Sequence, residues 1–301
     1  MIDRSDVEAA DRRISGLVRH TPLVAVEPGR LWFKLEYLQH TGTFKARGAL
    51  NRVLAAREAG EVDPAVGVVV ASGGNAGLAV AYAAARAGVP ATVFVPTISS
   101  PVKVARIRSL GAGVVQVGRE YAEAYEAALA HPGVLCHAYD QPEMVAGAGT
   151  LGLELLEDIE VDTVVVAVGG GGLMAGVAAA LAKQARVVGV EPDTAPTLHA
   201  ALAAGGPVDV RVSGVAADSL GARRLGSIAY DVAVQCGVRS VLVPDEALVR
   251  ARQELWREWR VVVETGAAAA YAALLDGAYR PEPGERIAVV LCGANTDPGD
   301  L

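Results

Sequence analysis

The sequence predicts an α/β protein with open, mostly parallel sheets that are flanked by helices. Short β-branched runs recur along the 301 residues, helix-like segments separate most of them, and glycine or proline marks many junctions. Strands that alternate with helices form parallel sheets, because each connecting helix covers a face of the sheet. Hydrophobic residues make up 52% of the chain and charged residues 20%, so we expect a large core in two domains or one two-lobed unit.

Seven short valine- and isoleucine-rich runs are the expected strands. They are GVVVA from Gly67, ATVFV from Ala91, GVVQV from Gly113, TVVVAV from Thr163, RVVGV from Arg186, SVLVP from Ser240 and RIAVVLC from Arg286. The segments between them carry helix start and stop signals. We expect one helix to end at Gly88 and another to begin after Pro244. Ser100 is the expected N-cap of a third, with Pro101 in its first turn.

The chain has no internal repeat and no flexible linker, so a boundary between domains must be compact. The strand and helix patterns are weakest near residues 47–51 and 139–144. We therefore predict a small domain of residues 50–141, inserted into a large domain of residues 1–49 and 142–301.

Charge and cysteine content exclude several classes of protein. A net charge of −7 repels nucleic acids and anionic membranes, and the arginines are dispersed, so we expect neither partner. The three cysteines are an odd number without metal-ligand spacing, which is typical of a reducing compartment. The N-terminus lacks the apolar run of a secretory signal, which indicates a cytoplasmic protein.

One apolar stretch, residues 163–182, is long enough to span a bilayer and carries no charge. Its four consecutive glycines favour a buried strand, a glycine turn and an apolar helix instead. Such a turn can bring backbone amides to an anion at the helix N-terminus, and we expect phosphate as the bound ligand. The spacing matches neither the dinucleotide fingerprint nor a nucleotide-binding P-loop. The alternative is a turn that only lets the helix pack closely on the strand.

A second glycine-rich loop, SGGNAG at residues 72–77, also follows an apolar strand and opens a helix. The Ser72 hydroxyl, the Asn75 amide and the backbone amides are donors suited to a carboxylate or a phenolate. An ordinary helix N-cap remains the alternative interpretation.

The four lysines of the chain differ in their surroundings. Lys34 and Glu36 are two residues apart, which on a strand predicts a surface pair. Lys103 and Lys183 belong to a solvated helix face and a helix end. Lys45 alone lies in an apolar, glycine-rich segment, GTFKARG, where a lysine can become a neutral amine, as arginine cannot. A surface position for Lys45 is the alternative.

Seven motifs, taken in order, resemble the fold-type II pyridoxal-phosphate enzymes, and most closely their serine/threonine dehydratase branch. The resemblance covers nearly the whole chain and implies a two-domain fold similar to the tryptophan synthase β subunit, with pyridoxal 5'-phosphate as cofactor. The motifs are HTPL, KLEYLQHTGTFKARGALNRV, SGGNAGLAVAYAA, AGAGTLGLELLE, VVVAVGGGGLMAGVAAAL, VGVEP and VLCGANTD, with GVPATVFVP between the third and fourth.

The resemblance implies a role for residues of three loops and the last strand. Lys45 is the implied Schiff-base lysine, and Phe44 stacks on the pyridine ring. Asn75 donates to the phenolic oxygen, and Cys292 faces the pyridine nitrogen, unless it is simply a buried core cysteine. The implied phosphate site comprises Gly169, Gly170, Gly171, Gly172 and Leu173. The implied neighbours of the substrate carboxylate are Thr43, Ser72, Gly73 and Asn75.

These assignments imply β-elimination from L-serine or L-threonine, which yields pyruvate or 2-oxobutanoate with ammonia. A thiol or thiolate does not keep the ring nitrogen protonated as a carboxylate does, so the cofactor is a weaker electron sink and elimination is favoured. Lys45, with a pKa lowered by burial and by the cofactor, is the implied base at the α-carbon.

Departures from the family pattern refine this expectation. Racemases of the branch resemble SSGNHG here and use the second serine as an acid/base, whereas this chain has Gly73, which disfavours racemisation. Glu191, Ala195 and Thr197 align with the divalent-metal site of a subgroup, but a hydroxyl replaces one carboxylate, which favours a monovalent ion such as potassium. A solvated strand end is the alternative for Glu191. The sequence ends soon after CGANTD, so we expect no C-terminal regulatory domain.

Three alternatives remain open from the sequence. A related β-eliminase or β-replacement enzyme could act on another 3-hydroxy or O-substituted amino acid, and an amino-acid racemase is a further candidate. A non-catalytic protein that binds a phosphorylated metabolite is the alternative outside enzymes. For the assembly we expect a homodimer, the commonest symmetric state.

Overall fold

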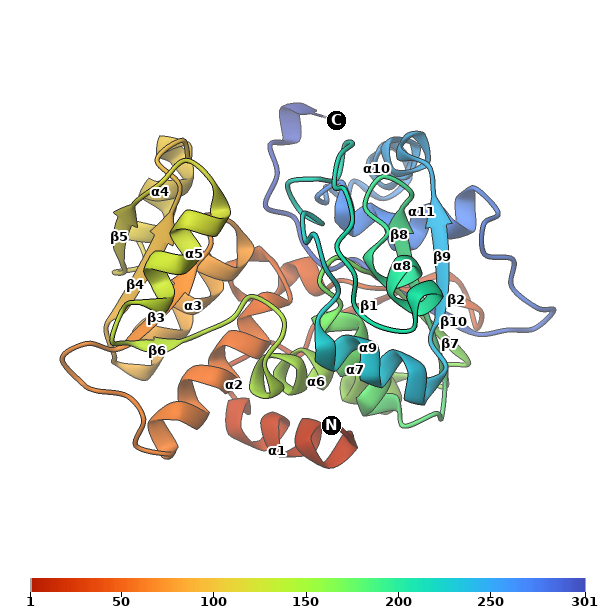
Figure 1. Ribbon diagram of the computed structural model, residues 1–301. Coiled ribbons are helices and arrows are strands. Elements are labelled where there is room, and N and C mark those ends of the chain that lie inside the picture. The colour runs from red at the N-terminus through yellow and green to blue at the C-terminus, as the bar shows by residue number, and fades with distance from the viewer. Residues whose placement is uncertain (1, 301) are drawn as a thin grey trace.

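The computed structural model describes residues 2–300, which form two lobes with one sheet each (Figure 1). Within this range the larger sheet has six strands in the order β1-β2-β10-β7-β8-β9, and β1 alone pairs antiparallel. The smaller sheet has four parallel strands in the order β5-β4-β3-β6. The predicted α/β class with mostly parallel sheets is confirmed.

All seven runs predicted as strands form strands. The structure adds the hairpin β1-β2 and the two-residue β6, which the composition of the chain did not indicate. The strands are β1 (Leu23–Glu27), β2 (Leu31–Lys34), β3 (Val68–Ala71), β4 (Ala91–Val95), β5 (Gly113–Gln116), β6 (Val134–Leu135), β7 (Thr163–Ala167), β8 (Arg186–Pro192), β9 (Arg239–Val243) and β10 (Ile287–Val290).

The helices begin and end where the sequence carries the expected signals. Gly88 is the left-handed C-cap of α3, Ser100 caps α4 ahead of Pro101, and α10 begins directly after Pro244. The helices are α1 (Arg4–Ile14), α2 (Lys45–Glu58), α3 (Asn75–Ala87), α4 (Pro101–Arg108), α5 (Tyr121–Leu129), α6 (Pro142–Asp158), α7 (Gly172–Leu181), α8 (Thr197–Ala204), α9 (Ser227–Cys236), α10 (Asp245–Trp259) and α11 (Ala269–Leu275), with short 3-10 turns at Glu36–Leu38, His40–Gly42, Gly266–Ala268 and Pro298–Asp300.

The two lobes have separate hydrophobic cores. In the larger lobe, α11 packs against β7, β8 and β9, and one buried cluster fills the space between sheet and helices. In the smaller lobe, α3 and α5 pack against β3 and β4, with their own buried clusters. The smaller sheet comes entirely from residues 68–135, which lie inside the segment 50–141 proposed as a domain.

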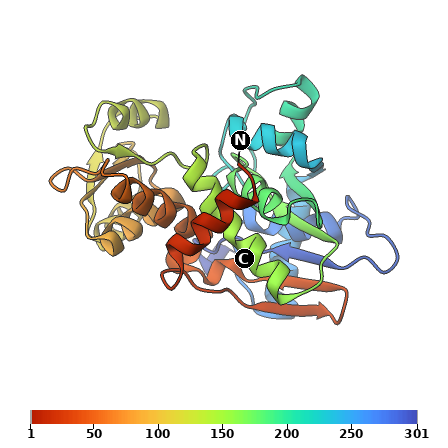
Figure 2. The same ribbon diagram turned by 90° about the horizontal axis from the view of Figure 1, so that it is seen from below.

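Helix α6 contacts α1, α2 and α7 and passes between the lobes, where α1 lies beside it (Figure 2). Glycines allow this close packing. A Cβ on Gly147 would lie 2.7 Å from the Gly48 Cα, and one on Gly149 would lie 2.5 Å from the Gly176 carbonyl oxygen. Larger residues there would push α2 and α7 away from α6, so the AGAGTLG motif serves helix packing.

A buried ionic network corrects the prediction for Lys34 and Glu36, which are not a surface pair. Both side chains are 0% exposed. Strand β2 ends at Lys34 and a 3-10 turn begins at Glu36, so strand alternation does not relate the two. Lys34 Nζ lies 2.7 Å from Glu154 Oε2, whereas Glu36 Oε1 accepts from Arg47 Nε at 2.6 Å.

The apolar stretch at residues 163–182 divides as predicted into strand β7, a glycine turn and helix α7. Within residues 2–300, no helix combines the length and the apolar character that crossing a bilayer requires.

Candidate active site

Lys45 is the first residue of α2 and is held beside the end of β10. Thr43 and Gly293 form an isolated antiparallel bridge, and the Phe44 amide donates to the Cys292 carbonyl at 3.1 Å. These bonds join the loop before α2 to the segment after the central strand β10. The structure therefore brings Thr43, Phe44 and Lys45 next to Cys292, although 247 positions separate Lys45 from Cys292 in the chain.

The Lys45 amine points into the protein. Nζ donates to the Ala138 carbonyl at 2.7 Å and lies 5.0 Å from the centroid of the Phe44 ring. Burial lowers the pKa of Lys45 to about 8, although Cys292 and Glu264 act in the opposite direction. Lys103 and Lys183, in contrast, are exposed. At neutral pH an appreciable fraction of this one amine is therefore uncharged and able to react.

The tetraglycine turn, Gly169 to Gly172, connects β7 to α7 and lies across the same pocket. Phe44, Lys45, Tyr139 and Gly172 all line this pocket. A Cβ on Gly170, Gly171 or Gly172 would collide with a neighbour: on Gly170 it would lie 2.3 Å from Tyr139 Cγ. The turn is thus a side-chain-free cradle at the N-terminus of α7, followed by the buried Leu173, and it suits a phosphate group.

The SGGNAG loop follows β3 and opens α3. The Gly74 amide donates to the Ser72 hydroxyl at 3.2 Å. Asn75 Nδ2 donates to both carboxylate oxygens of Glu264, at 2.8 and 3.0 Å, and Asn75 Oδ1 accepts from Asn295 Nδ2 at 2.7 Å. These bonds fix the orientation of the Asn75 amide and tie the smaller lobe to the C-terminal segment.

Glu264 is a site residue that the sequence reasoning missed. Its side chain is buried, accepts from the Asn295 amide at 3.1 Å, and influences the pKa of both Lys45 and Cys292. Burial raises the pKa of Glu264, although its hydrogen bonds with Asn75 and Asn295 oppose this. A glutamate that directly follows the apolar run Val261 to Val263 was the available signal, since buried carboxylates need partners.

Cys292 is buried at the carboxyl end of β10, close to the Lys45 amine. Burial raises the pKa of its thiol to about 12, and the nearby Glu264 adds to the effect. The side chain is therefore a neutral thiol at physiological pH. Of the two forms considered from the sequence, thiol and thiolate, burial favours the thiol.

The predicted cation ligands Glu191, Ala195 and Thr197 lie together where the end of β8 leads into the first turn of α8. The Glu191 carboxylate accepts from the Leu198 amide at 2.6 Å and the His199 amide at 2.9 Å, and it lies 2.9 Å from the Thr197 hydroxyl. That hydroxyl is also 2.5 Å from the Gly169 carbonyl oxygen. Glu191 is buried rather than a solvated strand end, and it joins α8 to the tetraglycine turn. Cation binding there remains a prediction.

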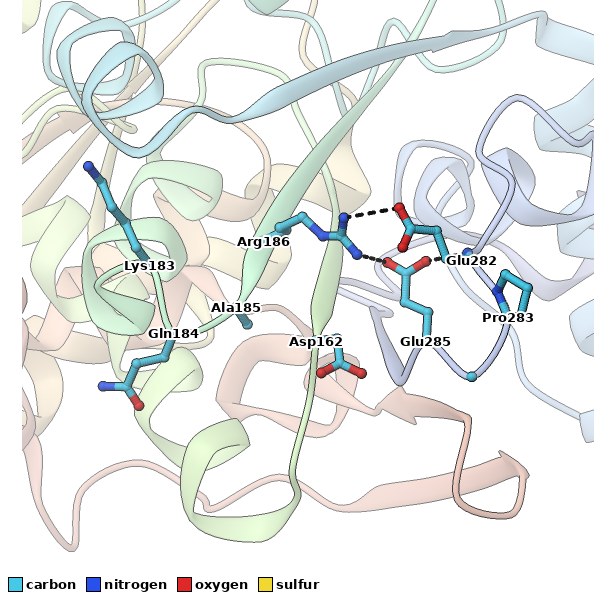
Figure 3. Close-up of a pocket in the computed structure, with 9 residues that line it drawn as sticks. Asp162, Lys183, Gln184, Ala185, Arg186, Glu282, Pro283 and Glu285 are labelled. Atoms are coloured by element: carbon cyan, nitrogen blue, oxygen red, sulfur yellow. Dashed lines mark hydrogen bonds and ion pairs between the residues drawn. The ribbon is translucent and has the colours of Figure 1, made fainter.

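A larger cavity of about 390 Å³ lies elsewhere and is not the reactive site (Figure 3). It includes Asp162 and Arg186, at the amino ends of β7 and β8, whereas the tetraglycine turn follows the carboxyl end of β7. Three of its charged side chains pair with one another, since Arg186 contacts Glu282 at 3.5 Å and Glu285 at 3.0 Å.

A desolvated lysine in a pocket that also includes the glycine turn at a helix N-terminus is a feature of an enzyme that holds a phosphorylated aldehyde. The chain belongs to the family described as "Pyridoxal-phosphate dependent enzyme", whose model matches residues 14–293. This confirms the family resemblance and the cofactor that it implies.

The most similar proteins include lyases that act on 3-hydroxy amino acids. The chain is 34% identical to an L-threonine ammonia-lyase of Thermotoga maritima, over 99% of this chain and 76% of that protein. It is 38% identical to a phenylserine dehydratase of Ralstonia pickettii, over 98% and 94%. The solved structure of a threonine deaminase from T.th. superposes with a TM-score of 0.86 at 35% identity, over 98% and 99%. The chain is accordingly a PLP-dependent enzyme of the ammonia-lyase kind.

Proposed function

We propose that this chain catalyses β-elimination from L-serine and L-threonine, forming pyruvate or 2-oxobutanoate and ammonia. One observation carries the proposal: a lysine amine with its pKa lowered to about 8 shares a pocket with a side-chain-free glycine cradle. The relatives described as threonine ammonia-lyase and threonine deaminase support the choice of reaction.

Bound pyridoxal phosphate supplies an electron sink for the charge that develops at the substrate α-carbon. In our proposal the uncharged Lys45 amine accepts the α-proton, and the Ala138 carbonyl, 2.7 Å from Nζ, orients it. The neutral Cys292 thiol places no charge beside the ring nitrogen. A weak sink favours prompt loss of the β-hydroxyl over a long-lived carbanion.

The remaining assignments come from the family resemblance and belong to the same proposal. The tetraglycine amides and Leu173 would hold the phosphate at the N-terminus of α7, and Phe44 would hold the pyridine ring. The loop residues Ser72, Gly73 and Asn75, together with Thr43, bind the substrate carboxylate and the phenolic oxygen. Gly73 has no hydroxyl to return a proton from the opposite face, which argues against racemisation.

Three further features belong to the same proposal. Glu191, Ala195 and Thr197 bind a potassium ion, whose charge would stabilise the tetraglycine turn through Thr197. The enzyme works as a homodimer in the cytoplasm. Activity in potassium against tetramethylammonium buffers, and size-exclusion chromatography with light scattering, test the first two directly.

The decisive experiment locates the lysine that binds the cofactor. Borohydride reduction of the holoenzyme followed by mass spectrometry of its peptides should give a pyridoxyl group on Lys45 and on no other lysine. Lys45→Ala should lower 2-oxo acid formation from serine and threonine by at least about 1,000-fold, an order-of-magnitude expectation for loss of a base that also forms a covalent bond. Lys103→Ala, at an exposed lysine, is the matched control. Modification elsewhere, or activity retained by Lys45→Ala, would refute the assignment.

A further inference from the structure

One connecting segment lies against both halves of the candidate active site. Residues 136–141 join β6 to α6 and pass between the two lobes (Figure 1). The Ala138 carbonyl accepts the 2.7 Å hydrogen bond from Lys45 Nζ, and the ring of Tyr139 packs on the tetraglycine turn. Both residues line the pocket together with Lys45 and Gly172, so this segment connects the amine to the turn.

The segment is neither helix nor strand, so side chains fix its backbone. The His137 amide donates to Gln141 Oε1 at 2.7 Å, and His137 Nδ1 accepts from the amides of Tyr139 and Asp140 at 3.2 and 2.9 Å. These bonds are local: they fold the segment but do not place it against the larger lobe. That placement depends on a long bond from the Tyr139 hydroxyl to the Arg224 carbonyl, at 3.3 Å, and on the carboxylate of Asp140.

Asp140 binds the start of helix α9. Its carboxylate accepts from the Ser227 amide at 3.0 Å and from the Ile228 amide at 3.1 Å, although 87 positions separate Asp140 from Ser227. The N-cap residue of this helix, Gly226, has no side chain that can cap these amides. A carboxylate at a helix N-terminus is stabilised by the free amides and by the helix dipole. Asp140 is thus a helix cap supplied by a distant part of the chain.

The same end of α9 is bonded to the tetraglycine turn. The Gly226 amide donates to the Gly170 carbonyl at 3.1 Å, and a Cβ on Gly171 would lie 2.6 Å from the Ala229 Cβ of α9. A Cβ on Gly226 would lie 2.7 Å from Asp140 Oδ1. The Asp140 carboxylate and the turn therefore both contact the first residues of one helix.

We propose that Asp140 is a positioning residue that fixes the distance between the Lys45 amine and the tetraglycine turn. Its carboxylate joins the segment that carries Ala138, the acceptor of the amine, to the helix that is bonded to the turn. This inference rests on the proposed function, in which the amine and the turn bind the two ends of pyridoxal phosphate. A rigid ligand held at both ends binds tightly only if the two sites are spaced as its own groups are. Loss of the Asp140 carboxylate should therefore weaken binding of the whole cofactor more than binding at either end alone.

The test compares three ligands in fluorescence titrations of the full-length apoprotein. Pyridoxal phosphate reaches both ends, pyridoxal lacks the phosphate, and pyridoxine 5'-phosphate lacks the aldehyde. Asp140→Ala should weaken pyridoxal phosphate about tenfold, the factor that corresponds to loss of one helix cap, and the other two ligands by less than about threefold. Asp140→Asn keeps an oxygen that accepts from the helix amides, and should bind pyridoxal phosphate within about threefold of the wild type.

Asp3→Ala is the matched control, because Asp3 caps helix α1 by accepting from the Ser5 and Asp6 amides. It should lower the thermal unfolding midpoint, as Asp140→Ala does, and leave the affinity for pyridoxal phosphate unchanged. The three ligands distinguish positioning from stability, since a general loss of stability weakens all of them alike.

Unchanged affinity for pyridoxal phosphate in Asp140→Ala would overturn the inference, as would an equal loss for all three ligands. If Asp140→Ala does not fold, Gly226→Ala gives the answer in the same comparison, because its Cβ pushes the carboxylate away from α9. The borohydride experiment separates the two proposals. A cofactor on a lysine other than Lys45 overturns the proposed function and this inference with it, whereas a cofactor on Lys45 without a ligand-dependent effect of Asp140→Ala overturns the inference alone.

Discussion

At the scale of single residues, burial shifts the pKa values of the groups that surround the Lys45 amine. Lys45 has a lowered pKa, and Cys292 and Glu264 have raised ones, with burial as the largest cause in each case. Burial penalises the charged form of every group, so it favours the neutral amine, thiol and carboxyl group. Burying these groups lowers the free energy of unfolding, and the same burial makes the amine more reactive.

The cost at Lys45 can be measured in the apoprotein. Because the pKa of Lys45 is lowered from 10.5 to about 8, the native state disfavours the charged amine, and stability from this group rises as pH increases from about 8 to 10.5. Lys45→Met should therefore be more stable than the wild type at pH 7, by up to about 3 kcal/mol. Urea unfolding at pH 7, 8, 9 and 9.5 should show the difference shrinking above pH 8. A pH-independent difference, or a less stable variant, would contradict this account; Lys103→Met provides the baseline.

Glu264 and Asn75 should act as one unit. Because Glu264 holds the Asn75 amide with two contacts, Glu264→Gln removes one acceptor and should lower kcat/KM about tenfold or more, as should Asn75→Ala. In the double variant the losses should not add, since each single change already breaks the pair. Strictly additive effects in this double-mutant cycle would show that Glu264 acts independently of Asn75.

At the scale of elements, the glycine-rich connections after β3 and β7 are the two loops to which we assign the binding of substrate and cofactor. They could be predicted because each follows a valine run and opens a helix, so glycine stood out against a regular pattern. The hairpin β1-β2 and the short β6 could not, because a two-residue strand and a partly exposed edge hairpin have no distinct composition. Glu264 could not be predicted as a site residue, because its partners Asn75 and Asn295 lie 189 and 31 positions away in the sequence.

The tetraglycine turn gives a test at this scale. Gly170→Ala places a Cβ 2.3 Å from Tyr139 Cγ, so the ring or the turn must move. We expect the free energy of unfolding to fall by about 1–3 kcal/mol and pyridoxal phosphate to bind at least about tenfold more weakly, as for other overpacked sites. Thermal unfolding and fluorescence titration of the apoprotein measure the two effects.

Two variants check the physical cause of that loss. Gly206→Ala enters open space and should change neither quantity. Tyr139→Ala combined with Gly170→Ala removes the clash and should restore stability relative to Tyr139→Ala alone. If the Gly170→Ala protein were as stable as the wild type, glycine at this position would be needed for cofactor binding and not for folding.

At the scale of the whole molecule, the buried ionic network joins the first strands, α2 and α6. Arg47 Nη1 lies 2.6 Å from Glu154 Oε1, Lys34 reaches the same carboxylate, and the Thr21 hydroxyl donates to Glu36 at 2.7 Å. Arg47 belongs to α2, two residues after Lys45, so the network fixes the helix that carries the reactive amine. Sequence alone did not reveal it, because the lysine and glutamate that appeared to be a pair each have a different partner.

Removing the centre of this network should damage stability and catalysis together. Arg47→Leu leaves the buried carboxylates of Glu36 and Glu154 without their main partner, and loss of one member of a buried ion pair costs about 3–5 kcal/mol. Arg257→Leu breaks an exposed pair with Glu254 on α10 and should cost less than about 1 kcal/mol. In denaturant unfolding of the holoenzyme, only Arg47→Leu should lower the unfolding midpoint substantially. The Arg47→Leu protein that remains folded should also have a lower kcat, because α2 no longer holds Lys45 in place. Equal shifts for the two variants would mean that the network does not anchor α2.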